Sequence, residues 1–319
     1  MSSIKVTICV PTYNAAKYLN RCIDSLIKQT LRDIEIIIIN DGSTDNTAEI
    51  CESYAKLDSR IRIIHLQNSG SAVARQVALN NAKGEYIIVC DSDDWVEASM
   101  YEKLYLKAKE TNADLIYSGT YFNYPNGREI KKLPTVYPTN SKDLIHAILN
   151  HRILPSTCNK LIKLKFIKDN KISYTPQINV GEDLLFILKI AKYPIKIAYV
   201  NDAFYHYVRM VGSNSYTNNP KPITFDELNY IYQWKKQNLN HKEYGQELFI
   251  SAIDVAYLGI RIKNLKPEKF NIFINNEIQF KDIIKYRKLN LKIGLVLISK
   301  INYRLAKIIN QLFYRLVYK

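Results

Sequence analysis

Three aspartates gather behind an apolar run in the first third of the chain. Residues 86–90 are apolar, and Asp91, Asp93 and Asp94 follow them within four positions. Carboxylates this close together repel one another, so we expect either a divalent cation or a solvated edge to compensate them, and a bound cation would in turn bind a phosphate. The alternative is a helix N-terminus, where the helix dipole favours acids and Asp94 would serve as the cap. Capping needs one acid and not three, so the spacing predicts a metal and phosphate site.

The elements around this cluster alternate between strand and helix patterns. Strand patterns cover residues 5–10, 34–40, 61–65 and 86–90, and amphipathic helix patterns cover 16–29, 47–57 and 71–82. This alternation predicts an α/β fold, a doubly wound and mostly parallel sheet with helices on both faces. Ligands bind such sheets at the carboxyl ends of the strands. Residues 11–14, 41–45 and 91–93 follow strands, so we expect all three segments on one rim.

The rest of the chain divides near residue 220. Short strands and turns are expected from residue 111, with helices at 141–150 and from 181 onward, so that residues 1–220 form one domain. Residues 221–319 are predicted to be a mainly helical region. No internal repeat or low-complexity tract interrupts either part.

A basic segment ends the chain. Residues 281–319 hold ten Lys and Arg residues and one acid, and so contribute +9 of the net charge of +15. One helical face carries Lys300, Arg304, Lys307, Gln311 and Arg315, and another carries Ile301, Leu305, Ile308, Leu312 and Leu316. A basic amphipathic helix suits an anionic membrane surface, but the same periodicity fits a helix packed on its own domain. The pattern leaves both open.

Composition excludes several classes of protein. At 319 residues and 47% hydrophobic, the chain can bury a large core, and no apolar stretch approaches the about 20 residues that cross a bilayer. The five cysteines lack metal or redox spacing and are expected to be buried free thiols. Because the positive charge is concentrated at the end of the chain, no nucleic-acid partner is expected. The protein is expected in the cytoplasm, either free or peripheral on the inner face of the cell membrane.

Five short segments together resemble the family 2 inverting glycosyltransferases of bacterial polysaccharide synthesis, which have the GT-A fold. The resemblance runs from residue 6 to about 215. It rests on Val10-Pro11-Thr12-Tyr13-Asn14, Asn40-Asp41-Gly42-Ser43-Thr44-Asp45, residues 70–75, Asp91-Ser92-Asp93-Asp94 and Gly181-Glu182-Asp183. It implies a hexosyltransferase whose residues 1–110 bind the nucleotide and whose residues 111–220 form the acceptor side.

The resemblance also implies roles for residues that would bind the donor. Pro11 and Tyr13 would lie against the uracil ring of a UDP-sugar, and Asp41 would accept a hydrogen bond from the uracil imide N–H. Arg75 would face the nucleotide beside a helix N-terminus, or else be an ordinary solvated helix arginine. Asp91 would lie near the ribose hydroxyls.

Metal binding and catalysis are implied for a second group. Asp93 would hold Mn²⁺ or Mg²⁺ on the diphosphate, and His206 would be a further metal ligand. Asp183 resembles the family's base, which takes the proton from the acceptor hydroxyl. Glu182 would help to hold the acceptor and Arg209 would contact phosphate. The acids at 182 and 183 would also be ordinary residues at a helix start.

The leading hypothesis is an inverting transfer of sugar from a UDP-sugar to a glycan or lipid-linked glycan acceptor, a precursor of surface polysaccharide. One alternative is a non-catalytic sugar-binding or assembly protein derived from this fold. Another is a sugar nucleotidyltransferase, which needs a glycine-rich basic loop after the first strand. Residues 11–19 contain no glycine and a single lysine, which disfavours this second alternative.

Overall fold

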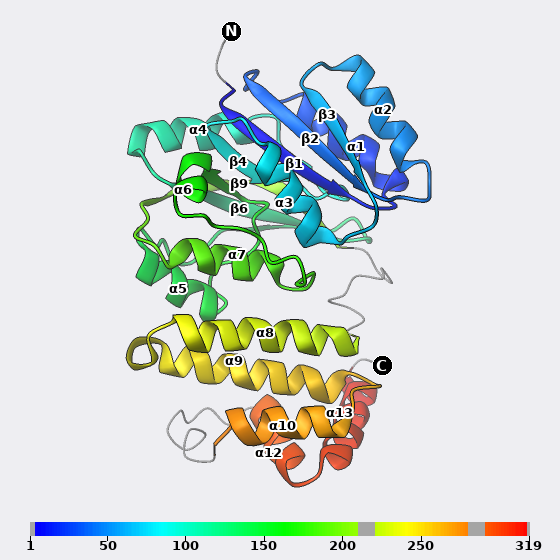
Figure 1. The fold of residues 1–319 in the computed structure, drawn as a ribbon, viewed down its shortest axis with the longest axis vertical. Helices are drawn as coiled ribbons and strands as arrows, with labels where there is room; N and C mark the ends of the chain where they lie inside the picture. The colour runs from blue at the N-terminus through cyan, green and yellow to red at the C-terminus, as the bar shows by residue number, and fades with distance from the viewer. Residues whose placement is uncertain (1–3, 210–220, 280–290, 318–319) are drawn as a thin grey trace. The chain divides into compact units, whose positions relative to one another are not determined.

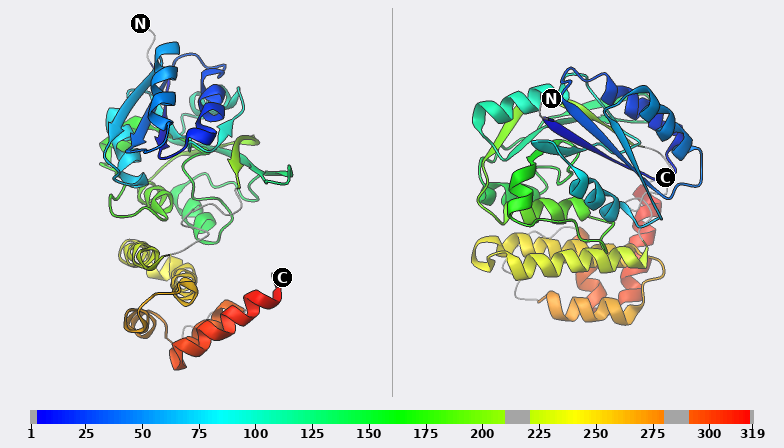
Figure 2. Two further views of the ribbon diagram at one scale, coloured as in Figure 1. Left: turned by 90° about the vertical axis from the view of Figure 1, so that its right-hand side faces the viewer. Right: turned by 45° about the horizontal axis from the view of Figure 1, so that its top comes forward.

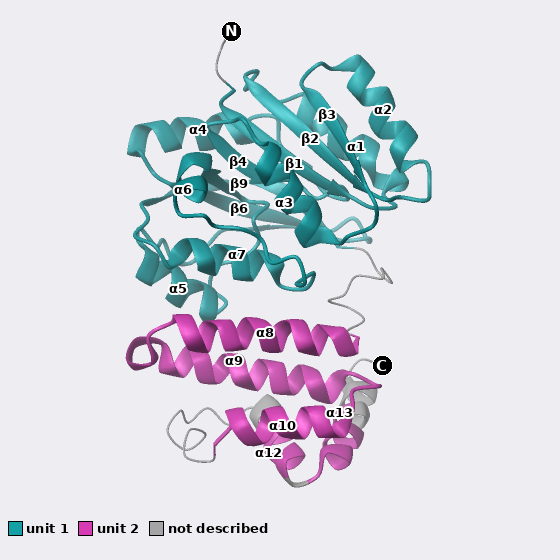
Figure 3. Cartoon of the chain, in the orientation of Figure 1, with its two compact units in different colours: residues 1–211 teal, residues 212–319 magenta. Residues whose placement is uncertain are grey.

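The computed structural model describes residues 4–209, 221–279 and 291–317. The chain forms two compact units, Met1–Val211 and Gly212–Lys319, shown in different colours in Figure 3. Each unit has its own hydrophobic core.

The first unit begins with the predicted alternation of strands and helices. Its elements are β1 (Val6–Thr12), α1 (Ala16–Ile27), β2 (Ile34–Asp41), α2 (Thr47–Leu57), β3 (Ile61–Leu66), α3 (Ser71–Asn81) and β4 (Tyr86–Val89) (Figure 1). The strands lie side by side in the order β3-β2-β1-β4, and every neighbouring pair among them is parallel. Every residue of β2 is buried, as expected of a strand covered on both faces.

The direction of each crossover decides which face its helix covers. Right-handed crossovers carry the chain outward from β1 to β2 and β3, and then back from β3 to β4. They therefore place α1 and α2 on one face of the sheet and α3 on the other, as Figure 2 shows for α1 and α3. The predicted doubly wound arrangement is confirmed.

The second part of this unit extends the same sheet. Its strands are β5 (Trp95–Val96), β6 (Leu115–Asn123), β7 (Glu129–Lys132), β8 (Lys160–Lys163) and β9 (Ile197–Val208), and its helices are α4 (Met100–Thr111), α5 (Ser141–Leu149), α6 (Leu164–Asp169) and α7 (Glu182–Ala191). β8 lies between β4 and β6 and is antiparallel to both. β6 therefore runs parallel to β4, and the carboxyl ends of β1, β2, β4 and β6 point to the same rim.

The second unit is helical in its described residues. Its helices are α8 (Pro222–Asn238), α9 (His241–Arg261), α10 (Pro267–Glu277), α12 (Leu291–Ile301) and α13 (Tyr303–Val317). α9 contacts each of the other four, and aromatic side chains such as Phe225, Phe270 and Phe273 fill the space between them. The prediction of a helical C-terminal region is confirmed.

Candidate active site

Arg75 is the centre of the candidate site. It lies on α3, is 5% exposed, and reaches two segments that are far from it in sequence. Its Nη2 donates to Asp91 Oδ1 at 2.8 Å, and its Nη1 forms ion pairs with Glu182 and with Asp183 Oδ1, the latter at 3.3 Å. The alternative of a solvated helix arginine is wrong, because the side chain is buried among three carboxylates.

Charge balance around Arg75 shifts the pKa values of the cluster. Burial by itself lowers the pKa of the guanidinium, but the charges of Asp183, Asp91 and Glu182 outweigh burial and hold it well above its ordinary value. Burial raises the pKa of Glu182 to about 7, with Asp183 adding to the rise and Arg75 opposing it. One guanidinium therefore faces three carboxylates, and Glu182 titrates near neutral pH.

Asp183 is held in one orientation at the start of α7. Its Oδ1 accepts the Thr157 hydroxyl at 2.7 Å, and its Oδ2 accepts the Thr157 backbone N–H at 3.1 Å. Gly181 precedes the helix in the left-handed region with φ of +82°, a conformation that suits glycine. The helix start places Asp183 and Glu182 beside Arg75.

Asp91 and Asp93 follow β4 at the rim, as predicted. Asp91 contacts Arg75 and also accepts the Cys158 thiol at 3.3 Å. Burial, with the charge of Asp91, raises the pKa of Asp93 to about 6, and Arg21 donates to the backbone oxygen of Asp93 at 2.8 Å. The two acids therefore differ: Asp91 is paired with Arg75, whereas burial and the charge of Asp91 disfavour the charged form of Asp93.

Asp94 does not cap a helix, which was the alternative role expected from the sequence, because strand β5 follows it directly. It is buried, and its carboxylate accepts the Tyr205 hydroxyl at 2.5 Å and the Val208 backbone N–H at 2.8 Å. Burial and the neighbouring Asp93 raise its pKa well above the ordinary value. Asp94 therefore joins the β4 end to β9.

The residues predicted to bind the base lie at the ends of β1 and β2. Tyr13 is 50% exposed and Pro11 lies within β1. Asp41 is buried and accepts the backbone N–H groups of Ser69 and Gly70, both at 2.8 Å. Asp41 therefore positions the loop that enters α3, a role that the sequence did not predict.

His206 lies away from the acids that it was predicted to join. On β9, Tyr205 points to Asp94, so His206, the next residue, points to the opposite face. Its ring is stacked between Trp95 and Tyr121, with centroid distances of 3.4 and 4.5 Å, and its nitrogens contact Glu97 at 3.0 Å and Glu129 at 3.3 Å. The structure does not bring His206 to Asp93.

Arg209 lies at the end of β9 and is exposed. Its guanidinium lies over the rings of Phe122 and Tyr124, 5.4 and 5.6 Å from their centroids.

The acids at this rim fit a divalent cation only in part. Within the described ranges, no group of three or more His, Cys, Asp or Glu side chains is arranged to hold a metal by itself. Mg²⁺ in phosphate sites is commonly held by one or two carboxylates together with substrate phosphates, so Asp93 fits a cation that arrives with a diphosphate. Burial and the charge of Asp91 raise the pKa of Asp93, so its charged form is disfavoured by itself, and a cation beside it would offset the charge of both acids.

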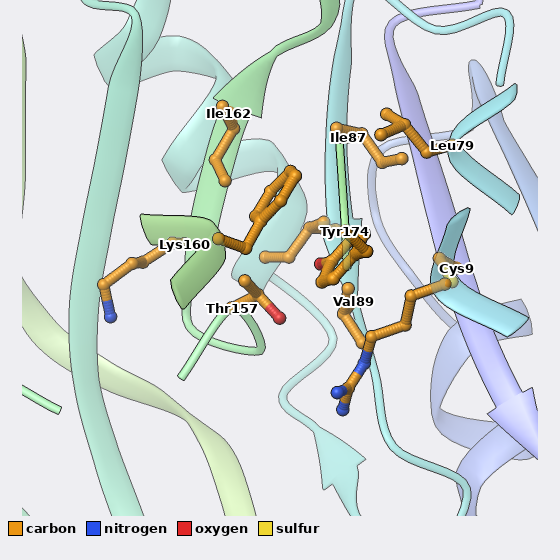
Figure 4. A pocket seen from close by; sticks show the side chains of 11 residues that line it. Cys9, Leu79, Ile87, Val89, Thr157, Lys160, Ile162 and Tyr174 are labelled. Carbon is orange, nitrogen blue, oxygen red and sulfur yellow. The ribbon is translucent and has the colours of Figure 1, made fainter. Parts of the chain in front are cut away.

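Sequence reasoning missed three residues of this site. Thr157 holds Asp183, Tyr205 donates to Asp94, and Lys160, which is fully buried, begins β8 beside Thr157 (Figure 4). The polar run before the apolar pair Leu161 and Ile162 was the available signal for Thr157 and Lys160.

A pocket with a mostly apolar lining lies next to Arg75. Its lining includes Cys9, Leu79, Val89, Ile162 and Tyr174, together with Arg75, Thr157 and Lys160 (Figure 4). An apolar surround limits access of water to the ion pairs and strengthens them.

Comparisons with known proteins agree with this architecture. The family model for glycosyl transferase family 2 matches residues 7–170. Glycosyltransferase GlyG of Streptococcus pneumoniae is 32% identical over 82% of this chain and 86% of its own length.

Two further proteins extend the comparison. The poly(ribitol-phosphate) beta-glucosyltransferase of Bacillus spizizenii is 30% identical over 64% of the chain, which spans about a third (32%) of that relative's length. A crystal structure of S. aureus TarS 1-349 in complex with UDP-GlcNAc has a TM-score of 0.64 and 20% identity, and covers 94% of this chain and 91% of that chain. The fold, the family model and the relative GlyG lead to one conclusion: this chain belongs to glycosyl transferase family 2 and is a glycosyltransferase.

Proposed function

We propose that the protein transfers a sugar from a UDP-sugar to an acceptor hydroxyl with inversion. The observation that carries this proposal is the convergence of the β4 end and the α7 start on Arg75, which places Asp91 and Asp183 in one cluster. Tyr13 is exposed at the same rim, where its ring is free to stack on a base. The UDP-GlcNAc bound by TarS supports a uridine nucleotide as donor.

Asp183 is the proposed base. As the acceptor oxygen bonds to the anomeric carbon, the bond between that carbon and the diphosphate breaks on the opposite face, and the acceptor proton passes to Asp183. The Thr157 hydrogen bonds and the Arg75 ion pair hold the carboxylate for this step. Glu182, which pairs with the same Nη1 of Arg75 as Asp183 does, is proposed to hold the acceptor.

Asp93 is the proposed ligand for Mn²⁺ or Mg²⁺. A bound cation would neutralise charge as the diphosphate leaves. Asp91 is proposed to lie near the ribose, and Arg209 near phosphate. His206 is not among the proposed ligands, because its side chain points to the opposite face of β9 and its ring nitrogens have carboxylate partners, Glu97 and Glu129.

The acceptor is proposed to be a glycan or lipid-linked glycan, a precursor of surface polysaccharide. The Bacillus spizizenii relative is named as a glucosyltransferase of a polymer, poly(ribitol-phosphate), which supports a polymeric acceptor. Among the described residues no helix is long and apolar enough to cross a bilayer. We propose peripheral attachment to an anionic membrane through an exposed face of α13. On α13, Leu305 and Ile308 are 47% and 53% exposed, beside the exposed Arg304.

Calorimetry with UDP, dTDP, GDP and CDP, with and without Mn²⁺, tests the donor class. We expect UDP to bind tightest and Mn²⁺ to strengthen its binding to wild type but not to Asp93→Asn. A panel of UDP-sugars, beginning with UDP-GlcNAc, then identifies the donor by release of UDP. Absence of binding by every nucleotide would overturn the proposal.

A further inference from the structure

Lys160 is a fully buried lysine near Asp183, the proposed base. Its ammonium has three N–H donors, and three oxygens accept them: Leu154 O at 2.6 Å, Ser156 O at 2.7 Å and Asn159 Oδ1 at 2.8 Å. All three belong to the turn that leads into β8. Lys160 therefore ties residues 154–160 to one another, and we call this segment the lysine turn.

The lysine turn reaches the proposed reaction centre through consecutive side chains. Thr157 donates its hydroxyl and its N–H to Asp183. Cys158 donates its thiol to Asp91, and Asn159 donates to Ser118 O of β6 at 2.7 Å. One turn thus contacts the α7 start, the β4 end and β6.

We propose that Lys160 and Thr157 are positioning residues for the transfer, a proposal that rests on Asp183 being its base. Lys160 fixes the lysine turn, and Thr157 then holds the Asp183 carboxylate in one rotation. Within the described residues, Asp183 Oδ1 accepts the Thr157 hydroxyl and forms an ion pair with Arg75, whereas Oδ2 accepts only the Thr157 N–H. Oδ2 therefore has more free accepting capacity, and it is the oxygen that receives the acceptor proton.

The cost of burying Lys160 supports a positioning role. Taking an ammonium out of water is unfavourable, and burial lowers the pKa of Lys160 to about 7 despite the opposing charge of Asp183. Its hydrogen-bond acceptors among the described residues are neutral oxygens, so no ion pair with those residues offsets that cost. The aliphatic part of the side chain lines the apolar pocket, while the nitrogen points away from Thr157 (Figure 4). A buried methionine would pack in the same volume without holding the turn.

Lys160→Met is the first test, with Lys163→Met as its control. Lys163 lies on the same strand and its ammonium is exposed, 3.4 Å from Asn112 Oδ1. Hydrogen exchange should accelerate in Lys160→Met at residues 154–160 and at the first turn of α7, and stay unchanged in β1 and β2. The kcat for UDP release from UDP-GlcNAc, or from the donor that the panel identifies, should fall about 10- to 100-fold. Its KM should change less than its kcat, because the proposed base-binding residues Tyr13 and Asp41 lie on other elements, and Asp91 is the proposed donor-binding residue that contacts the lysine turn, through Cys158. Lys163→Met should match wild type in both measurements.

Thr157→Val and Thr157→Ser provide the second test. Valine removes the hydroxyl and serine keeps it, so kcat should fall about tenfold in the first and recover in the second. Unchanged kcat in both Lys160→Met and Thr157→Val would overturn the positioning role, as would faster exchange throughout the sheet with no local focus.

Failure of the proposed function gives a different result. Wild type would then bind no nucleotide and release no UDP, while the exchange pattern of Lys160→Met would still report whether Lys160 fixes the turn that holds Asp183. The part of the proposal in which the lysine turn holds Asp183 is overturned if Lys160→Met leaves hydrogen exchange at the α7 start unchanged.

Discussion

At the scale of single residues, the site is defined by unequal charge. Arg75 is one buried cation among Asp91, Glu182 and Asp183, and Asp93 lies next to this cluster with a raised pKa. An excess of buried negative charge is unfavourable by itself and becomes favourable when cationic or proton-donating groups arrive with the substrates.

Replacing Asp183 by Asn should lower kcat by about 10²- to 10⁴-fold, because the amide cannot accept the acceptor proton. UDP affinity should remain within about twofold of wild type, since this change affects the chemical step. Calorimetry and UDP release measure the two quantities. Glu182→Gln is the matched control and should retain more activity than Asp183→Asn, whereas equal turnover by Asp183→Asn and wild type would assign the base elsewhere.

Replacing Asp93 by Asn should stabilise the metal-free protein at pH 7.5. The folded-state pKa of about 6 lies above the ordinary 3.8, so the charged carboxylate destabilises the fold above pH 6, and this effect disappears below pH 4. After allowance for solvent screening we expect about 1 kcal/mol, seen as a higher Tm at pH 7.5 and no gain at pH 4.

Mn²⁺ with UDP should raise the Tm of wild type and not of Asp93→Asn. Because a proton competes with the cation, this rise should weaken as the pH falls through 6. Asp169→Asn, at an exposed aspartate paired with Lys165, is the control. A lower Tm for Asp93→Asn than for wild type at pH 7.5, without metal, would contradict the predicted stabilisation.

At the scale of elements, the entry to α3 links the rim proposed to bind the base to the carboxylates around Arg75. Asp41 at the end of β2 accepts the N–H groups of Ser69 and Gly70. The helix α3 then begins at Ser71 and carries Arg75 about one turn from its start. The loop before α7 closes over this entry, where Asn179 Oδ1 accepts the Ala72 N–H at 3.4 Å. Small backbone changes at this entry therefore affect several site residues.

Gly70→Ala should be destabilising and should weaken UDP binding. Gly70 has φ of +91°, and a Cβ there would lie 2.3 Å from Asn179 Oδ1. Strain and the displaced Asn179 together should cost about 1 to 3 kcal/mol of unfolding free energy. Chemical denaturation and calorimetry measure the two effects.

Gly127→Ala separates strain from the clash. Gly127 also has a positive φ, of +79°, but nothing lies within 4 Å of the added Cβ. It should cost less stability than Gly70→Ala and leave UDP binding unchanged. Equal losses in the two variants would mean that backbone strain, and not the contact with Asn179, determines the effect.

At the scale of the whole molecule, the chain combines a sheet-based transferase unit with a helical unit that ends in a basic segment. α13 packs against its own unit through Tyr303, Ala306 and Asn310, and Tyr303 donates to Gly259 O at 2.9 Å. Lys307, expected on the basic face, donates to Ile262 O and Lys263 O beyond the end of α9. One face of α13 is therefore structural, while Leu305 and Ile308 on another face are exposed. The side chains of 301 and 311–317 lie outside those described.

Leu305→Glu with Ile308→Glu should reduce binding to anionic vesicles at least about tenfold, because membrane affinity follows buried apolar area. Co-sedimentation measures this binding. Leu57→Glu with Ile272→Glu adds the same charge at two exposed positions outside α13 and should bind as wild type does. Equal loss in both double variants would mean that net charge alone, and not the α13 face, is responsible.

Much of this molecule was predictable from local patterns. Apolar periodicity placed β1 to β4 and their helices to within about two residues, because strand and helix repeats are properties of neighbouring residues. The same patterns predicted that Asp41, Asp91 and Tyr13 share a rim, since parallel strands end at one edge. The cysteines are free and buried in the structure, as expected.

Only the tertiary structure decided which partners these residues have. The antiparallel insertion of β8 between β4 and β6 brings Thr157 to Asp183 and buries Lys160, one of 45 Lys and Arg residues in the sequence. Side-chain alternation on β9 sends Tyr205 to the acids and His206 away from them. These contacts join segments that are distant in sequence, and their identity depends on strand order and on which face each side chain occupies. Several strand orders are compatible with the same local pattern, so periodicity determines neither the strand order nor the face that each side chain occupies. The contacts among the candidate site residues are therefore a property of the tertiary structure.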